Sequence, residues 1–216
     1  MSSDKRLLLE KVPLGRGISL DIGGGDGHLS SALEDRGYEY VNVDLRPSGV
    51  VPAVVGDAHR LPLKTGCAVL AVSCDALEHF EEPLTALTEI NRVLRSDGTL
   101  VMMVPFLHPF HGDDLFRYTP EGLRLLFRKS DFSIVSLESP LWIASFITQI
   151  LIVVLQRLRL GFLERPLERA AAWIDQRLRR FQGDMGFAAA YLVVAQPLPR
   201  RPVGTASERP AMESAR

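Results

Sequence analysis

The chain has 216 residues, of which 46% are hydrophobic and 24% charged, and its formal net charge is -1. This length and composition predict a single soluble globular domain with a sizeable core. A net charge so close to zero argues against a global electrostatic attraction to nucleic acid. The two cysteines, Cys67 and Cys74, lack metal-ligand spacing and are expected to be reduced thiols. The first residues contain no long apolar core, so no secretory signal is expected.

Short β-rich runs alternate with helical patterns from residue 18 onward. The expected strands are 18–22, 40–45, 53–58, 68–77, 99–106, 132–139 and 187–196. The clearest helical patterns are 28–37, 83–98 and 119–130, the last with Thr119 as its N-cap. Strands that alternate with crossover helices predict an α/β fold with a doubly wound, mostly parallel sheet. Such sheets bind ligands beyond the carboxyl ends of their strands.

A glycine cluster, LDIGGGDGHL, follows the first expected strand. Its pattern is D-x-G-x-G-x-G, formed by Asp21, Gly23, Gly25 and Gly27. A bare turn needs one glycine, so several glycines indicate a ligand that lies against the main chain at the start of a helix. His28 stands where the dinucleotide fingerprint requires its third glycine. The pattern therefore disfavours a nicotinamide-dependent oxidoreductase.

Acidic residues also end the next two strands. Asp44 closes the second strand, where a carboxylate can accept hydrogen bonds from a ribose diol. Asp57 follows the third strand and is succeeded by Ala58. Taken singly, Asp44 could be a solvated carboxylate, and Asp57 could form an Asx turn before Pro62. Three acids at successive strand ends, in order, favour one shared binding site.

The stretch VSCDALEHF, followed by a helix carrying R-V-L and a further strand, completes a recognisable series of motifs. The series resembles the class I S-adenosylmethionine-dependent methyltransferases, in particular the small-molecule, type 11-like branch, over residues 16–139 and 187–196. The resemblance implies a seven-stranded Rossmann-like sheet of order 3-2-1-4-5-7-6, with S-adenosylmethionine as cofactor and no metal. It implies that the cofactor is bound by Asp21, Gly23, Gly25, Gly27, Asp44, Leu45, Asp57, Ala58, Cys74, Asp75 and His79.

The loop after the fifth strand, residues 105–123, is rich in histidines, acids and aromatics. It resembles a family pattern, H-x-x-x-D-x-x-R-Y-T, associated with glycan or lipid-linked acceptors, although the spacing from the histidine differs here. Methyl transfer needs a base only if the acceptor must lose a proton. His111 is the candidate base and Asp114 its catalytic neighbour, with His108 as a competitor. Alternatively, Asp114 and Arg117 brace the loop as an ion pair and Tyr118 anchors it in the core.

Residues 140–186 do not belong to the minimal fold and predict a helical insertion between the sixth and seventh strands. Residues 139–156 carry no charge, whereas residues 157–180 contain seven arginines and three acids. A membrane span is not expected, because both flanking strands must join one sheet on one side of a membrane. A membrane-interface anchor, a homodimerisation arm, a lid over an apolar acceptor and a helical pair packed on the domain all remain open.

The sequence thus predicts a methyltransferase domain over residues 1–196 and a disordered tail at 197–216. The expected protein is cytoplasmic, with peripheral contact at the inner face of a membrane as an alternative. Its acceptor is expected to be a small molecule or a lipid- or glycan-like compound, methylated at oxygen. Nucleic acid is not expected as an acceptor, because no N-P-P-Y-like tetrapeptide follows the fourth strand. The rival hypothesis is a catalytically inactive, methyltransferase-like binding or scaffold protein.

Overall fold

A computed structural model describes residues 3–46, 52–107, 112–158, 160–182 and 188–199. Its single sheet has seven strands in the order β3-β2-β1-β4-β5-β7-β6, which confirms the predicted order. The pairs along the sheet are parallel from β3 to β5, whereas β7 runs antiparallel to both of its neighbours. The strands are β1 (Gly17–Ile22), β2 (Tyr38–Asp44), β3 (Ala53–Val55), β4 (Ala68–Cys74), β5 (Leu94–Pro105), β6 (Phe132–Trp142) and β7 (Ala188–Pro197).

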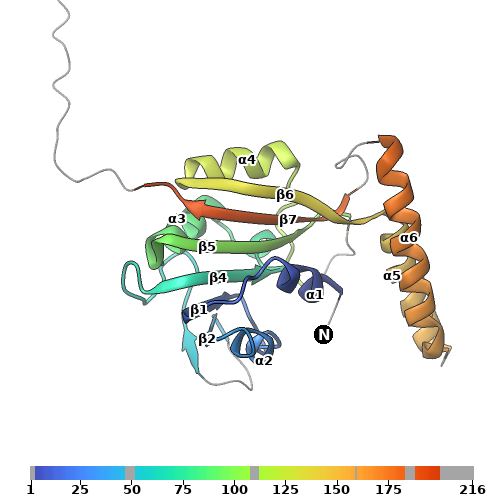
Figure 1. The fold of residues 1–216 in the computed structure, drawn as a ribbon, viewed down its shortest axis with the longest axis horizontal. Helices are drawn as coiled ribbons and strands as arrows, with labels where there is room; N and C mark the ends of the chain where they lie inside the picture. The colour runs from blue at the N-terminus through green and yellow to red at the C-terminus, as the bar shows by residue number, and fades with distance from the viewer. Residues whose placement is uncertain (1–2, 47–51, 108–111, 159, 183–187, 200–216) are drawn as a thin grey trace, which may run out of the picture.

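Helices cover both faces of this sheet, as Figure 1 shows. The helices are α1 (Ser3–Glu10), α2 (Ser30–Glu34), α3 (Pro83–Val93), α4 (Pro120–Lys129), α5 (Ile143–Arg157) and α6 (Glu164–Gln182), with short 3-10 turns at Leu77–His79 and Gly161–Leu163. One core cluster joins the sheet to α3 and α4 through side chains such as Ile90 and Phe127. A second cluster joins the opposite face to α1 and α2 through Leu8 and Leu33.

Several element boundaries differ from those predicted, and one helix was missed. The helix expected to reach Gly98 ends at Val93, because Leu94 already has an extended backbone and pairs with Ala68 of β4. Sequence pattern alone did not show this early start of β5. The first helix, α1, was not predicted at all, although Leu8 is fully buried and Leu9 nearly so. Thr119 caps α4 as expected, since its side chain accepts a hydrogen bond from the Gly122 N–H.

The insertion between β6 and β7 forms a helical hairpin, α5–α6, at one end of the sheet (Figure 1). Because β5 and β6 are both antiparallel to β7, β6 runs parallel to β5. The hairpin therefore leaves the sheet at the edge where β1, β4 and β5 also end. Among the described residues, every helix is too short or too polar to cross a bilayer.

Candidate active site

The glycine loop after β1 has a backbone that only glycine adopts readily. Gly23, Gly25 and Gly27 have φ angles of +73°, +53° and +67°. A Cβ atom on Gly23 would lie 2.6 Å from the Cβ of Ala76, so packing also restricts this position. A Cβ atom on Gly25 would meet nothing within 4 Å. Open space therefore borders the main chain at Gly25, as a bound ligand would require.

Two side chains of β2 hold this loop in place. The Gly25 N–H donates to Oδ2 of Asp44 at 3.0 Å, and Nδ2 of Asn42 donates to the Gly25 carbonyl at 2.8 Å. Asn42 is fully buried. Sequence analysis missed Asn42, although a second polar residue beside Asp44 in the strand VNVDL was a visible signal.

Asp21 lies beneath the glycine loop. Its side chain is buried, and the Tyr40 hydroxyl donates to its Oδ2 at 2.9 Å. Burial raises the pKa of Asp21 to about 6, although the Tyr40 hydrogen bond acts in the opposite direction. A Cβ on Gly24 would lie 2.7 Å from the Asp21 carboxylate, so loop and acid are closely packed. This geometry makes Asp21 a support of the loop.

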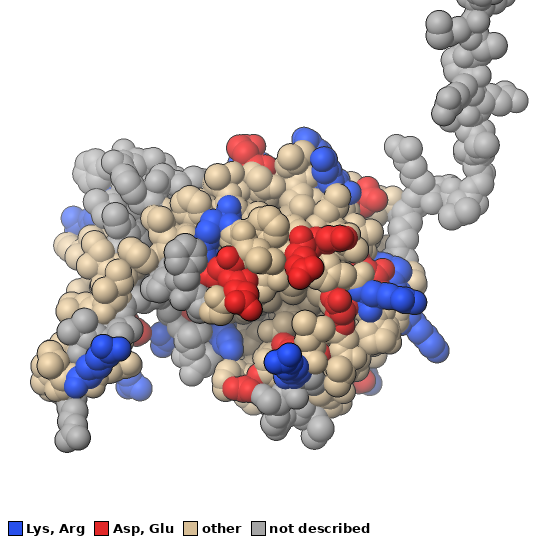
Figure 2. Space-filling view, turned by 180° about the vertical axis from the view of Figure 1, so that it is seen from behind, with Lys and Arg blue, Asp and Glu red and all other residues tan. Residues whose placement is uncertain are grey.

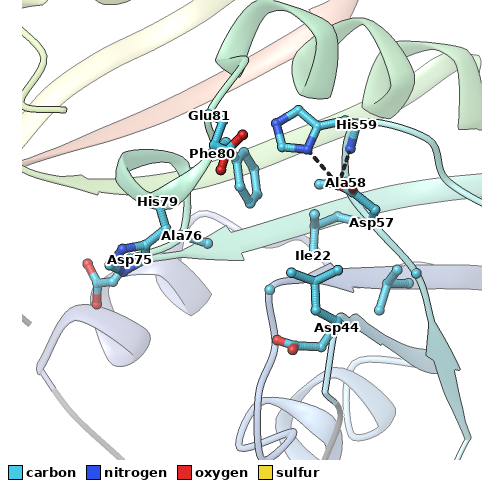
Figure 3. Close-up of a pocket in the computed structure, with 14 residues that line it drawn as sticks. Ile22, Asp44, Asp57, Ala58, His59, Asp75, Ala76, His79, Phe80 and Glu81 are labelled. Atoms are coloured by element: carbon cyan, nitrogen blue, oxygen red, sulfur yellow. Dashed lines mark hydrogen bonds and ion pairs between the residues drawn. The ribbon is translucent and has the colours of Figure 1, made fainter. Parts of the chain in front are cut away.

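A pocket of about 380 Å³ opens at the carboxyl ends of β1, β2, β3 and β4 (Figure 3). Seven of the residues predicted to bind the cofactor line it: Gly23, Asp44, Leu45, Asp57, Ala58, Asp75 and His79. The other predicted residues lie outside the lining. Of these, Asp21 supports the loop, Gly25 and Gly27 belong to the loop, and Cys74 packs against the α1 and α2 side of the sheet.

His59 joins two edges of the pocket and was missed by sequence analysis. Its Nε2 accepts a hydrogen bond from the Glu82 N–H at 3.1 Å, which assigns the ring proton to Nδ1. Nδ1 therefore donates to Oδ1 of Asp57 at 2.5 Å, an interaction drawn in Figure 3. The His59 backbone N–H also donates to Asp57 and, as the largest cause, holds the pKa of Asp57 below its usual value. Asp57 thus faces the pocket as an ionised acceptor.

Asp75 marks the opposite side of the pocket, where β4 ends. Its φ of +54° is unusual for a residue with a side chain. The Cys74 thiol donates to Oδ2 of Asp75 at 3.4 Å. Burial raises the pKa of Cys74, so this thiol stays protonated and is not a nucleophile at neutral pH.

The loops after β4 and β5 are joined to each other beside the pocket. The Glu78 carbonyl accepts hydrogen bonds from the Leu115 N–H at 2.9 Å and the Phe116 N–H at 3.2 Å. The buried Tyr118 hydroxyl donates to the Leu77 carbonyl at 3.2 Å, as expected for a core anchor. The Glu78 side chain is fully buried, and this burial raises its pKa to about 8.

Asp114 occupies the centre of this junction, with a side chain only 2% exposed. Its Oδ2 lies 2.5 Å from Nη2 of Arg117, so the loop-bracing ion pair considered above does form. Its Oδ1 lies 3.4 Å from Nδ1 of His79, and the same nitrogen lies 3.2 Å from the Asp113 carbonyl. The predicted base His111 and its competitor His108 fall outside the described residues.

Glu78, His79 and Asp114 each offer a ligand atom, and these atoms lie within 4.8 Å of one another. Carboxylate and imidazole donors of this kind can hold a divalent metal ion. The Arg117 guanidinium, however, already supplies positive charge to Asp114. The sequence predicted no metal, and the Arg117 contact favours an ion-paired network over a metal centre.

A pocket at the carboxyl ends of a doubly wound sheet, bordered by a glycine loop and two strand-end acids, is typical of sites that bind nucleotide-type ligands. Residues 20–102 match the methyltransferase domain family. An uncharacterised methyltransferase of Mycobacterium bovis is 30% identical over 115 residues, which cover 48% of this chain and 45% of that protein. These similarities support a class I S-adenosylmethionine-dependent methyltransferase family, and the chain spans about half the length of the curated relatives it matches.

Solved structures of low sequence identity share the fold. The cyclase SpnF superposes with a TM-score of 0.62 at 22% identity, covering 90% of this chain and 80% of that chain. A Haemonchus contortus phosphoethanolamine N-methyltransferase in complex with S-adenosylhomocysteine gives a TM-score of 0.61 at 16% identity, covering 90% of this chain and 52% of that chain. These likenesses establish the fold alone, because one architecture hosts several chemistries.

Proposed function

We propose that this protein transfers a methyl group from S-adenosylmethionine to a small-molecule or lipid- or glycan-like acceptor. The observation that carries the proposal is the open space against the Gly25 main chain, beside a pocket that Asp44 and Asp57 both line. Open space also borders Gly66, so the gap counts as support because it adjoins Asp44, which accepts from the Gly25 N–H and lines the pocket. The match of residues 20–102 to the methyltransferase domain family agrees with this activity.

The residues present suit an adenosyl group. The carboxylate of Asp44 would accept hydrogen bonds from the ribose hydroxyls, and that of Asp57 from the adenine amino group, with Ala58 beside the ring. The cavity volume of about 380 Å³ lies within the range of small-molecule sites. When bound, the cofactor supplies a methyl group already activated by the sulfonium charge. The protein then has to align the acceptor and exclude water, for which proximity alone contributes about 7–11 kcal/mol.

We assign the acceptor side of the site to the joined loops after β4 and β5. An oxygen acceptor would need a base, for which His111 remains the proposal, with Asp114 as its acidic neighbour. Arg117 fixes Asp114, so its carboxylate stays beside the pocket edge. Among the described residues, His79 also lines the pocket and faces Asp114, which makes it the second candidate.

We place this activity in the cytoplasm, at or near the inner face of a membrane. Cys67 and Cys74, both unbridged, agree with a reducing compartment. The partner reached through residues 140–186 would be a bilayer or a second copy of the chain.

The test is methyl transfer by the purified protein from isotopically labelled S-adenosylmethionine to compounds of a cell extract, followed by mass spectrometry. A labelled product that disappears with Asp44→Ala is the expected result. Cofactor binding without any labelled product, across soluble and lipid extracts, would favour the inactive scaffold instead.

A further inference from the structure

We propose that the α5–α6 hairpin is a docking surface for an anionic lipid bilayer. The proposal does not depend on the chemistry of the pocket. It rests on exposed apolar side chains, on the placement of the arginines, and on the edge of the sheet from which the hairpin leaves.

The first observation is an apolar stripe on α5. Ile147, Ile150 and Leu151 are spaced by three and four residues, which places them on one side of the helix. They are 58%, 47% and 41% exposed. Leu158 and Phe162, in the connection to α6, are also exposed, Phe162 by 74%. Surface helices rarely leave such a continuous apolar stripe in water without a partner.

The second observation is the outer face of α6. Arg169, Trp173 and Arg177 follow one another at intervals of four residues and are all exposed. The Arg177 guanidinium lies 4.8 Å from the Trp173 ring centre. Tryptophan and arginine together suit the boundary between lipid headgroups and acyl chains. The buried face of the same helix carries Ala171 and Asp175.

The third observation is a separation of charge. The structure describes the side chains of four arginines in the hairpin. All four are exposed: Arg157, Arg165, Arg169 and Arg177. Two of the three acids are engaged by other groups. Asp175 is buried and accepts a hydrogen bond from the Ala144 N–H at 3.0 Å, and Glu168 pairs with Arg6 of α1 at 3.6 Å, while the third acid, Glu164, is half-buried. The outward surface is therefore more basic than the composition of the hairpin indicates, which complements anionic lipid headgroups.

Helix length favours lying on a bilayer over crossing it. The 15 residues of α5 rise about 22 Å, which is shorter than the hydrocarbon core of about 30 Å. Figure 2 shows the hairpin as an arm with tan and blue side chains, whereas the body carries both red and blue side chains on the face in view. The acidic groups on that face of the body would be repelled by anionic lipid, which favours contact through the arm.

The hairpin is also oriented relative to the pocket. It leaves the sheet at the end of β6, on the edge where β1 and β4 end and where the pocket opens. The contact between Arg6 and Glu168 and the packing of Phe146 against the core hold the arm to the body. Docking by the arm would thus bring the pocket edge of the molecule close to the bilayer surface.

The test is flotation of the full chain with vesicles of phosphatidylcholine alone and of phosphatidylcholine containing about 30% phosphatidylglycerol. We expect flotation with the anionic vesicles at low salt and its loss at high salt. The double variant R169E/R177E should bind at least about 25-fold more weakly, at about five-fold for each arginine. Trp173→Ser should also weaken binding, because it removes the apolar anchor.

The matched control is R128E/K129E, which changes two exposed cations of α4 by the same charge. This control should float like the original protein, and circular dichroism should show that all variants are folded. An equal loss of flotation in both double variants, or no flotation of the original protein, would overturn the proposal. A stable dimer in sedimentation that R169E/R177E dissociates, without vesicle binding, would assign the surface to a second copy instead. S-adenosylhomocysteine binding, measured separately, reports on the pocket and is not expected to change in either double variant.

Discussion

The Gly25 N–H donates to Oδ2 of Asp44 at 3.0 Å and so ties the glycine loop after β1 to the carboxyl end of β2. This contact gives the strand-end acid a structural role in addition to the proposed one toward a ribose. Because the same carboxylate also lines the pocket, loop geometry and ligand binding are linked through one side chain.

Asp44→Ala should weaken the binding of S-adenosylhomocysteine at least about 30-fold, since it removes charged hydrogen bonds worth roughly 1.5–3 kcal/mol each. Isothermal titration calorimetry measures the loss directly. Asp97→Ala, which changes an exposed aspartate that pairs with Arg95, is the matched control and should bind normally. Equal affinity of the Asp44 variant and the original protein would remove Asp44 from the site.

Gly25→Ala should weaken the same binding about 10-fold or more, because its Cβ would enter the open space beside the loop. Gly66 offers a close control, since its φ is +66° and its Cβ would also meet nothing within 4 Å. Both substitutions introduce a similar backbone strain of about 1–2 kcal/mol. A loss of affinity in Gly66→Ala as well would mean that destabilisation, and not ligand contact, explains the result.

Asp21→Asn should reduce the pH dependence of the free energy of unfolding. The folded-state pKa of Asp21, about 6, exceeds the 3.8 of an exposed aspartate. Its contribution to stability is therefore complete below pH 3.8 and is lost as the pH rises through 6, a decrease of about 3 kcal/mol. Urea denaturation at pH 4 and pH 7 should show a smaller decrease for Asp21→Asn than for the original protein. An unchanged decrease in Asp21→Asn would contradict the raised pKa. The control Asp97→Asn, at an exposed site, should show the same decrease as the original protein.

Asp114→Asn and His111→Ala should each slow methyl transfer about 100-fold or more while S-adenosylhomocysteine binding stays within about two-fold. The expected reason is the loss of a positioned acid–base pair on the acceptor side. Turnover with the methylated acceptor, followed as a function of pH, is the measurement. Glu121→Gln, on exposed α4, should have no effect on turnover. Full activity of His111→Ala would discard the base assignment and leave His79 as the candidate to test.

The strands were predictable because each is a short apolar run, whereas their order in the sheet was predicted from the resemblance of the motifs to a known family. The strand-end positions of Asp44 and Asp57 follow from the same periodicity, so their placement around one pocket could be expected. The end of α3 could not be predicted, because Leu94 fits a helical face and a strand equally well. Only its pairing with Ala68 shows that it belongs to the strand.

Side-chain partners were less accessible to sequence reasoning. Asn42 and His59 act across strands or loops, and their spacing in the chain gives no sign of the contacts with Gly25 and Glu82. The same holds for Asp21, whose motif position suggests ligand contact but whose burial and bond to Tyr40 place it beneath the loop. Local pattern identified the residue types at the site, whereas tertiary packing determined which of them face the pocket.

Calorimetric titration of the unmodified protein with S-adenosylhomocysteine tests the central claim most directly. The account predicts one binding site per chain with a dissociation constant in the micromolar range or below. An absence of binding by folded protein at ligand concentrations of about 1 mM would contradict it.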